Sequence, residues 1–183
     1  MTTQTAGGAV LAGGQSRRMG TDKALLPIDG VAMARRVADA MRAAGLAPVV
    51  AIGGDEPSLS GLGLTVLPDL HPGAGPLGGI LTALASATTP WVVVTACDMP
   101  WIGPHEVTAL LDAIDDEVEV IVSTAGGQLQ PLHAAWRVTA LPAVSAAFAE
   151  GERAPRRAIG LLAQRAVELG TGDWAIDLDE PPG

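Results

Sequence analysis

The sequence predicts an α/β protein in which a mostly parallel β-sheet carries helices on both faces. The chain has 183 residues, 48% of them hydrophobic, enough for one domain that buries about 70% of the surface its unfolded chain would expose. Aromatic residues make up only 3%, so Ala, Val, Leu and Ile must form the core, as in strands buried on both faces. Short apolar runs alternate with segments of helical periodicity. We therefore expect a single three-layer, Rossmann-like domain over residues 1–183.

Charge and cysteine content narrow the classes of function. The formal net charge is -9 and the sequence pI is about 4.6, which argues against a broad surface for nucleic acid or for an anionic membrane. The lone Cys97 cannot form an internal disulfide, and the N-terminal residues lack the basic start and apolar core of a signal peptide. Residues 72–97 carry no charge, but Gly and Pro divide them into a loop, a helix and a strand. We expect a cytoplasmic protein.

The first strand, expected at Ala9–Ala12, leads into a glycine-rich loop that begins at Gly13 and Gly14. Two successive glycines let a ligand lie against the main chain, whose amides can donate hydrogen bonds to an anion. Three of the eleven basic residues follow within ten positions: Arg17, Arg18 and Lys23. Local positive charge in an acidic chain predicts a polyanionic ligand such as a nucleoside triphosphate. Solvated arginines beside a turn are the alternative, and Met19 excludes a Walker loop because it stands at that motif's second glycine.

The elements after this loop are predicted from apolar periodicity and from the Gly and Pro residues between them. In the first half we expect a helix at Ala32–Ala44, strands at Pro48–Ile52 and Leu64–Leu67, a helix from Gly75 through Ala87, and a strand at Trp91–Thr95. In the second half we expect a helix at Pro104–Ile114, a strand at Val118–Ser123, and helices at Val138–Ala149 and Ala154–Ala163.

Asp98 directly follows the strongest predicted strand. In open α/β sheets ligands bind at the carboxyl ends of the strands, so Asp98 is a candidate site residue, with a turn or helix cap as the alternative. Gly73, Gly75 and Gly78 fit a dinucleotide fingerprint, but they do not emerge from a strand and Pro76 occupies the turn, which disfavours a nicotinamide or flavin site. Cys97 is expected to be a packed, inert residue.

The three histidines, His71, His105 and His133, lack a zinc-binding spacing. Each is interpreted as a surface residue and not as a ligand.

Three motifs resemble those of the MobA-like molybdenum cofactor guanylyltransferases, a family of nucleotidyltransferases. They are LAGGQSRRMGTDK at Leu11–Lys23, GPLGG at Gly75–Gly79 and CDMP at Cys97–Pro100. The resemblance covers most of the chain and implies a nucleotide site made of Leu11, Ala12, Gly13, Gly14, Arg17, Arg18, Lys23, Asp69, Gly75, Pro76, Leu77, Gly78 and Asp98. Within this set, Arg18, Lys23 and Asp98 are the expected catalytic residues. The segment QLQPLHAAWR also resembles a short strand of the family, which implies a strand around Pro131 and Leu132.

The resemblance also implies a reaction, its substrates and a metal. GMP would pass from GTP to the phosphate of molybdenum-molybdopterin, with Mg²⁺ on Asp98 and on Asp177 or Asp179. Transient contact with other molybdenum-cofactor proteins is expected. Residues 1–100 would bind the nucleotide and residues 101–183 the acceptor, with its phosphate near Arg153, Arg156 and Arg157. A solvated linker is the alternative interpretation of these three arginines.

Base preference and activity rest on smaller features. Cytidylyl relatives carry LAAG where this chain has LAGG, so the glycine at position 13 implies room for a purine. The chain departs from the family pattern at Gly53 and Gly54, where an asparagine often stands near the base, and at Asp177–Asp179, where the family carries AsnxAsn. Transfer of CMP or another nucleotide to molybdopterin, a sugar phosphate or a phosphorylated metabolite is one alternative function. Nucleotide binding without catalysis is another.

Overall fold

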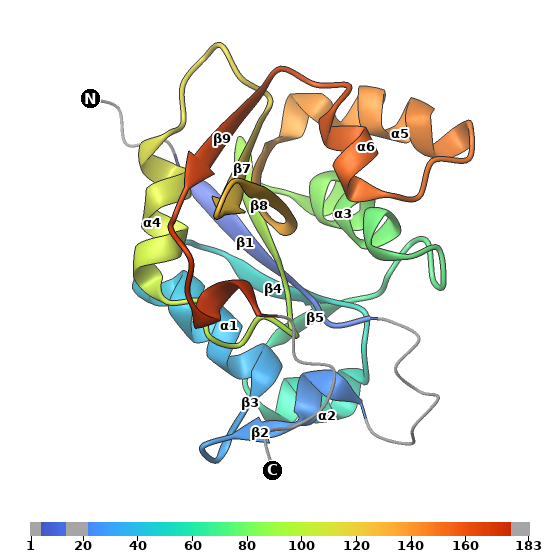
Figure 1. Ribbon diagram of the computed structural model, residues 1–183. Helices are drawn as coiled ribbons and strands as arrows, with labels where there is room; N and C mark the ends of the chain where they lie inside the picture. Colours follow the sequence, from blue (N-terminus) through green and yellow to red (C-terminus); the bar gives the residue numbers. More distant parts are fainter. Residues whose placement is uncertain (1–4, 14–21, 177–183) are drawn as a thin grey trace.

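The computed structural model describes residues 5–13 and 22–176. Its main feature is a seven-stranded sheet in the order β5-β4-β1-β6-β8-β7-β9, which runs through the middle of the molecule (Figure 1). The strands are β1 (Ala6–Leu11), β4 (Val49–Ile52), β5 (Thr65–Leu67), β6 (Trp91–Ala96), β7 (Val120–Ala125), β8 (Gln128–Arg137) and β9 (Gln164–Glu168). Only β8 pairs antiparallel with its neighbours. The predicted mostly parallel sheet is confirmed.

Helices cover both faces of the sheet, as predicted. On one face lie α1 (Met33–Ala43) and α4 (Pro104–Asp112), and on the other α3 (Pro76–Ser86), α5 (Leu141–Ala149) and α6 (Pro155–Ile159) (Figure 1). A fully buried cluster lies under each layer, with Val37, Met41 and Trp91 in one and Leu77, Ile80 and Trp136 in the other. Both clusters are mainly aliphatic, in keeping with the low aromatic content.

Short elements that the sequence analysis missed surround the N-terminal half. They are the helix α2 (Glu56–Gly61), the two-stranded hairpin β2 (Pro27–Ile28) and β3 (Val31–Ala32), and the 3-10 turn η2 (Lys23–Leu25). The Asp55 side chain caps α2 by accepting a hydrogen bond from the Ser58 amide at 3.1 Å. Elements this short carry too few apolar positions for a periodic signal.

The C-terminal part contains the largest correction. The helix expected at Ala154–Ala163 ends at Ile159. After a short turn, Gln164–Glu168 form the edge strand β9, which pairs with β7. Arg165 binds this strand to the neighbouring loop, since it pairs with Asp115 and donates to the Ala113 carbonyl at 2.9 Å. The sequence of Gln164–Glu168 is mostly polar and gave no strand signal. An exposed edge strand is specified mainly by its pairing with distant residues and only weakly by its own pattern.

Strand β8 is longer than the short strand expected around Pro131 and Leu132, and it contains a bulge. Its register with β7 shifts between Val122 and Ser123, so that residues 131–133 lie opposite a single step of β7. Pro131 has no amide hydrogen to donate and suits such a site. The bulge brings Leu132 to the carboxyl edge of the sheet and turns His133 into the core.

The interpretation of His133 as a surface residue is wrong. Its side chain is fully buried; its Nδ1 lies 2.9 Å from Thr95 Oγ1 on β6, and its ring lies 6.2 Å from that of Trp174 between centroids. Burial lowers the pKa of His133 to about 4, because the apolar surroundings disfavour the imidazolium. The histidine is therefore neutral at pH 7 and belongs to the core.

This buried histidine predicts a loss of stability in mild acid. Between pH 6.5 and about 4 the unfolded chain binds a proton at His133 that the folded chain does not, so the free energy of unfolding falls as the pH falls, by at most about 1.4 kcal/mol per pH unit from this residue. In urea titrations at pH 7 and pH 5, His133→Gln should lose less stability than the wild type between the two pH values. Equal losses in both proteins would contradict the prediction.

Candidate functional site

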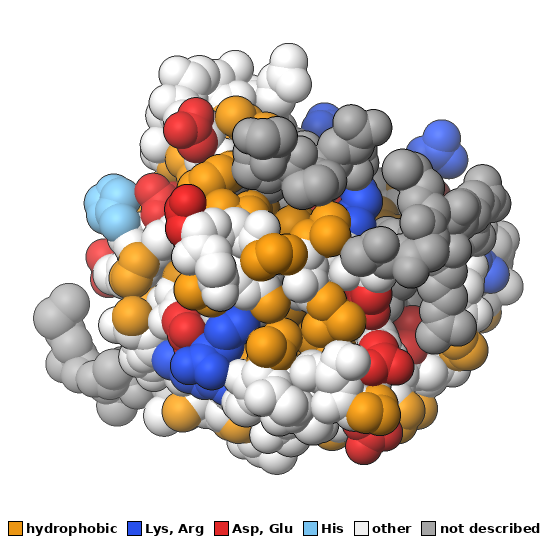
Figure 2. All heavy atoms as spheres, turned by 90° about the horizontal axis from the view of Figure 1, so that it is seen from below, with side chains coloured by type: hydrophobic (Ala, Val, Ile, Leu, Met, Phe, Trp, Pro, Cys, Tyr) orange, Lys and Arg blue, Asp and Glu red, His pale blue; other side chains and the backbone are white. Residues whose placement is uncertain are grey.

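A cavity of about 980 Å³ lies at the carboxyl ends of β1, β4, β5 and β6. This edge is where open α/β sheets bind ligands, since the loops that leave neighbouring strands diverge there. Figure 2 views the molecule toward this edge, and hydrophobic side chains occupy the middle of the face, with acidic and basic groups around them.

Most of the predicted nucleotide-binding residues that the structure describes come together in this cavity. Its lining includes Leu11, Ala12, Gly13, Lys23, Asp69, Gly75, Pro76 and Asp98. They come from the ends of β1 and β6, from η2 and from the loop before α3, so residues 87 positions apart in sequence share one site. Gly14, Arg17, Arg18, Asp177 and Asp179 lie outside the described residues and stay predictions.

We expected the Gly13 amide at the end of β1 to be free to bind an anion, but in the structure it has a partner within the sheet. The amides of Ala12 and Gly13 both donate to the Ile52 carbonyl of β4, each at 3.0 Å. The Gly13 amide is thus used within the protein, and the prediction that it donates to a phosphate is wrong for this structure. Gly13 itself is exposed and lines the cavity, so its contribution is open space above the main chain.

Leu77 and Gly78 do not line the cavity. Leu77 is fully buried beneath α3, so its side chain is not available to a ligand. A Cβ on Gly78 would lie 2.9 Å from His71 Cβ and 3.1 Å from the His71 carbonyl oxygen, and the Gly78 amide already donates to the Gly75 carbonyl. The glycine is needed because the loop crosses closely over the first turn of α3, and Gly79 lines the cavity in its place.

Asp69 is held by a hydrogen-bond network at the start of the same loop. Its Oδ1 accepts from the His71 amide at 2.9 Å and from Thr82 Oγ1 at 3.0 Å. Thr82 is buried within α3, and its hydroxyl also accepts from the Leu70 amide at 3.1 Å. Helix α3 therefore fixes the direction in which the Asp69 carboxylate faces the cavity.

Charged groups gather at the β6 end of the cavity. Asp22, Lys23 and Asp98 line the cavity together with Cys97, and all three charges act electrostatically on Cys97. Burial, reinforced by Asp98, raises the pKa of the Cys97 thiol far above its ordinary value. Cys97 is a neutral packed residue, as predicted, and is no nucleophile.

The donor set at this end suits a metal that binds few protein ligands. Across residues 5–13 and 22–176, no three His, Cys, Asp or Glu side chains are grouped so that they could hold a metal ion. Mg²⁺ is commonly held by one or two carboxylates together with water and substrate phosphates, and Asp98 is a carboxylate in the lining of the cavity. The described residues fit that mode and would not form an all-protein site.

The opposite end of the cavity lies at β4 and β5, where sequence analysis recognised only a departure from the family pattern. Gly53 and Gly54 have positive φ angles of 69° and 83°, and a Cβ on Gly54 would lie 2.7 Å from Leu59 Cδ1. Glu56 and the residues Val66, Leu67 and Pro68 complete the wall. The two glycines that directly follow the strand were the feature of the sequence from which this wall of the cavity could have been predicted.

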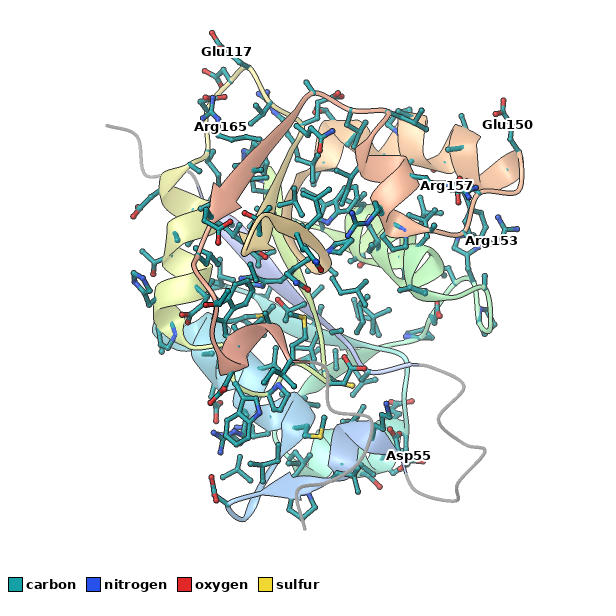
Figure 3. The ribbon with its side chains drawn as sticks, in the orientation of Figure 1. Asp55, Glu117, Glu150, Arg153, Arg157 and Arg165 are labelled. Carbon is teal, nitrogen blue, oxygen red and sulfur yellow. The ribbon has the colours of Figure 1, made fainter. Side chains whose placement is uncertain are left out.

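The three arginines predicted to bind the acceptor lie outside the cavity lining. Arg153 stacks on Phe148 at 3.9 Å, Arg156 donates to the Leu129 carbonyl at 3.0 Å, and Arg157 lies 3.7 Å from Glu152. Figure 3 shows Arg153 and Arg157 beside the turn between α5 and α6. The Phe148 ring also contacts His71 at 4.8 Å between centroids, so Arg153 is linked to the loop that borders the cavity. The acceptor role stays a prediction.

No helix among the described residues is long and apolar enough to cross a membrane.

Comparisons with known proteins identify the family to which this chain is similar. Residues 8–167 match the family model of the MobA-like NTP transferase domain. A probable molybdenum cofactor guanylyltransferase from Pelotomaculum thermopropionicum is 44% identical over 129 residues, which span 70% of this chain and 62% of that protein. The molybdenum cofactor guanylyltransferase of Rhodobacter capsulatus is 37% identical over 181 residues, 96% of this chain and 85% of the relative.

Solved structures share the fold. Molybdopterin-guanine dinucleotide biosynthesis protein A from Archaeoglobus fulgidus superposes with a TM-score of 0.68 at 25% identity, covering 88% of this chain and 83% of that one. A putative protein from Aquifex aeolicus gives a TM-score of 0.81 at 22% identity, with 98% and 96% covered.

The Asp69 network predicts that Thr82→Val destabilises the protein. Valine preserves the shape but leaves the Leu70 amide and the Asp69 carboxylate without the hydroxyl that joins them, which should cost about 1–3 kcal/mol in the free energy of unfolding. Urea denaturation measures the loss. Thr82→Ser, which keeps the hydroxyl, is the control and should retain most of the stability. A valine variant as stable as the wild type would show that the network contributes nothing.

Proposed function

This chain belongs to the family of MobA-like NTP transferases, and from that membership and the cavity we propose that it transfers GMP from GTP to the phosphate of molybdenum-molybdopterin. The products are the guanine dinucleotide form of the cofactor and pyrophosphate. The observation that carries the proposal is the cavity at the carboxyl ends of β1 and β6, whose lining includes both Lys23 and Asp98. The names of the full-length relatives support the choice of donor and acceptor.

The reaction joins two phosphates, so charge and alignment are its main requirements. An oxygen of the molybdopterin phosphate attacks the α-phosphorus of GTP, and the bond from that phosphorus to the bridging oxygen of pyrophosphate breaks. The attacking phosphate is already an anion, so the protein need not supply a general base. Lys23 neutralises charge on the triphosphate, and the predicted contribution of Arg17 and Arg18 adds to it.

Mg²⁺ is the proposed metal, with Asp98 as its ligand from the described residues. When bound, the ion supplies charge neutralisation for phosphate oxygens. Asp98 sits at the end of β6, whose carboxyl-terminal turn is tied to β1 by the Cys97 amide donating to the Leu11 carbonyl at 3.1 Å. The aspartate is therefore carried by a rigid element. Asp177 or Asp179 as a second ligand belongs to the same proposal.

The compartment proposed for this reaction is the cytoplasm, which holds the GTP pool.

A comparison of nucleotides tests the proposal directly. The protein is incubated with molybdopterin, Mg²⁺ and each of GTP, CTP, ATP and UTP, and pyrophosphate release is measured. Turnover should require GTP and molybdopterin together. Turnover with CTP alone would identify a cytidylyl enzyme, and binding of GTP without turnover would identify a nucleotide-binding protein.

Asp98→Asn is predicted to abolish Mg²⁺-dependent pyrophosphate release. The amide keeps the shape of the side chain but removes the charge that a hard divalent cation needs, so kcat/KM should fall by about three orders of magnitude, comparable with the loss of other groups that stabilise transition-state charge. Near-normal turnover with an unchanged requirement for Mg²⁺ would show that another residue holds the ion.

Gly13→Ala is predicted to weaken GTP relative to CTP. A Cβ at this position would lie 3.6 Å from Gly53 Cα and from the Ile52 carbonyl oxygen, which is ordinary contact, so the variant should fold like the wild type. The added methyl group narrows the space between β1 and β4, where a purine needs more room than a pyrimidine. The ratio of kcat/KM for the two nucleotides measures the effect, with thermal unfolding as the check on folding. An unchanged ratio would remove the steric explanation.

A further inference from the structure

The two ends of the cavity differ in chemistry, which assigns an orientation to a bound nucleotide. Lys23 and Asp98 both line the cavity and both act electrostatically on Cys97, just beyond the end of β6, so this end suits phosphates and their metal. At the other end, beyond β1, the wall consists of Gly53, Gly54 and the apolar segment 66–68. The triphosphate belongs at the charged end, so the base of the nucleotide lies over β4 and β5.

The main-chain amides at the base end have little capacity to donate hydrogen bonds to a base. The amides of Ala12 and Gly13 donate to the Ile52 carbonyl, and the Gly53 amide donates to the Leu67 carbonyl at 2.9 Å. These groups are consumed by the contacts that join β1, β4 and β5. The glycines lack side chains that would obstruct a planar ring, and a side chain of the lining can supply a charged acceptor for the donor groups on its edge.

At this end the cavity lining has two charged side chains: Asp69, whose Cβ would lie 3.5 Å from a Cβ on Gly53, and Glu56. It stands in the first turn of α2, which the Asp55 cap fixes directly after Gly54. Two other carboxylates of the lining are already engaged: Asp22 accepts from the Ala24 amide at 3.0 Å, and Asp69 is bound by Thr82. The Glu56 side chain is exposed and has no hydrogen bond or ion pair with the described residues.

We propose that the Glu56 carboxylate recognises the guanine of the donor nucleotide by accepting hydrogen bonds from its N1–H and its 2-amino group. A carboxylate offers two acceptor oxygens and no donor, and these two guanine groups are adjacent donors on one edge. Adenine presents an acceptor nitrogen at position 1, which a carboxylate repels. The assignment rests on the proposed use of GTP and adds the residue that selects it.

Binding measurements with base analogues test this assignment. Kd values for GTP, ITP and ATP are measured with Mg²⁺ by calorimetry for the wild type, Glu56→Gln and Glu56→Ala. ITP lacks the 2-amino group, so the wild type should bind GTP about tenfold more tightly than ITP, as expected for a hydrogen bond to a charged group. In both variants GTP affinity should fall about ten- to a hundredfold, and the GTP to ITP ratio should approach one.

Glu117→Gln is the matched control. It makes the same change of charge in an exposed glutamate that lies at the opposite end of the molecule from Asp55, the neighbour of Glu56 (Figure 3), and it should leave all three Kd values unchanged. Thermal unfolding checks that each variant is folded.

The outcomes separate this assignment from the proposed function. Unchanged GTP to ITP and GTP to ATP ratios in the folded Glu56 variants would overturn the role of Glu56 and leave the transfer of GMP intact. A wild-type protein that binds ATP more tightly than GTP would overturn the proposed function, and the role of Glu56 with it.

Discussion

The carboxyl end of β1 is the constraint on which the site depends. The Ile52 carbonyl of β4 accepts hydrogen bonds from Ala12 and Gly13, and on the other side the Leu11 carbonyl accepts one from the Cys97 amide. The end of β1 is thereby fixed between its two neighbours in the sheet. These contacts are backbone hydrogen bonds within a buried sheet. They therefore fix the position of the charged end of the cavity relative to the wall formed by Gly53 and Gly54.

The reversed strand β8 connects the second half of the chain to this arrangement. Its bulge at residues 131–133 directs Leu132 into the cavity lining and His133 into the core. His133 meets Thr95 of β6, three residues before Asp98. The proposed metal ligand therefore stands at the end of a strand that is packed from both neighbouring strands, which limits how far the carboxylate can move.

The loop between β5 and α3 joins the nucleotide side to the arginine-containing turn after α5. Thr82 of α3 holds the beginning of this loop through Asp69, and Phe148 of α5 packs on His71. Arg153 in turn stacks on Phe148. The only phenylalanine of the chain thus lies between the cavity border and one of the arginines predicted to meet the acceptor, and the cation–π contact holds that guanidinium in place.

The sequence by itself determined the fold class, the order of the main elements and the position of Asp98, because apolar periodicity and the Gly and Pro residues are local signals. Lys23 and Gly13, which it predicted to bind a nucleotide, both line the cavity. It misjudged His133 and missed β9, since the burial of a lone histidine and the pairing of an edge strand depend on residues far away in the chain. Only the tertiary structure decided that the Gly13 amide is consumed by β4 and that Glu56 faces the same cavity as Asp98. These relations arise where separate strands end together, and spacing along the sequence does not encode them.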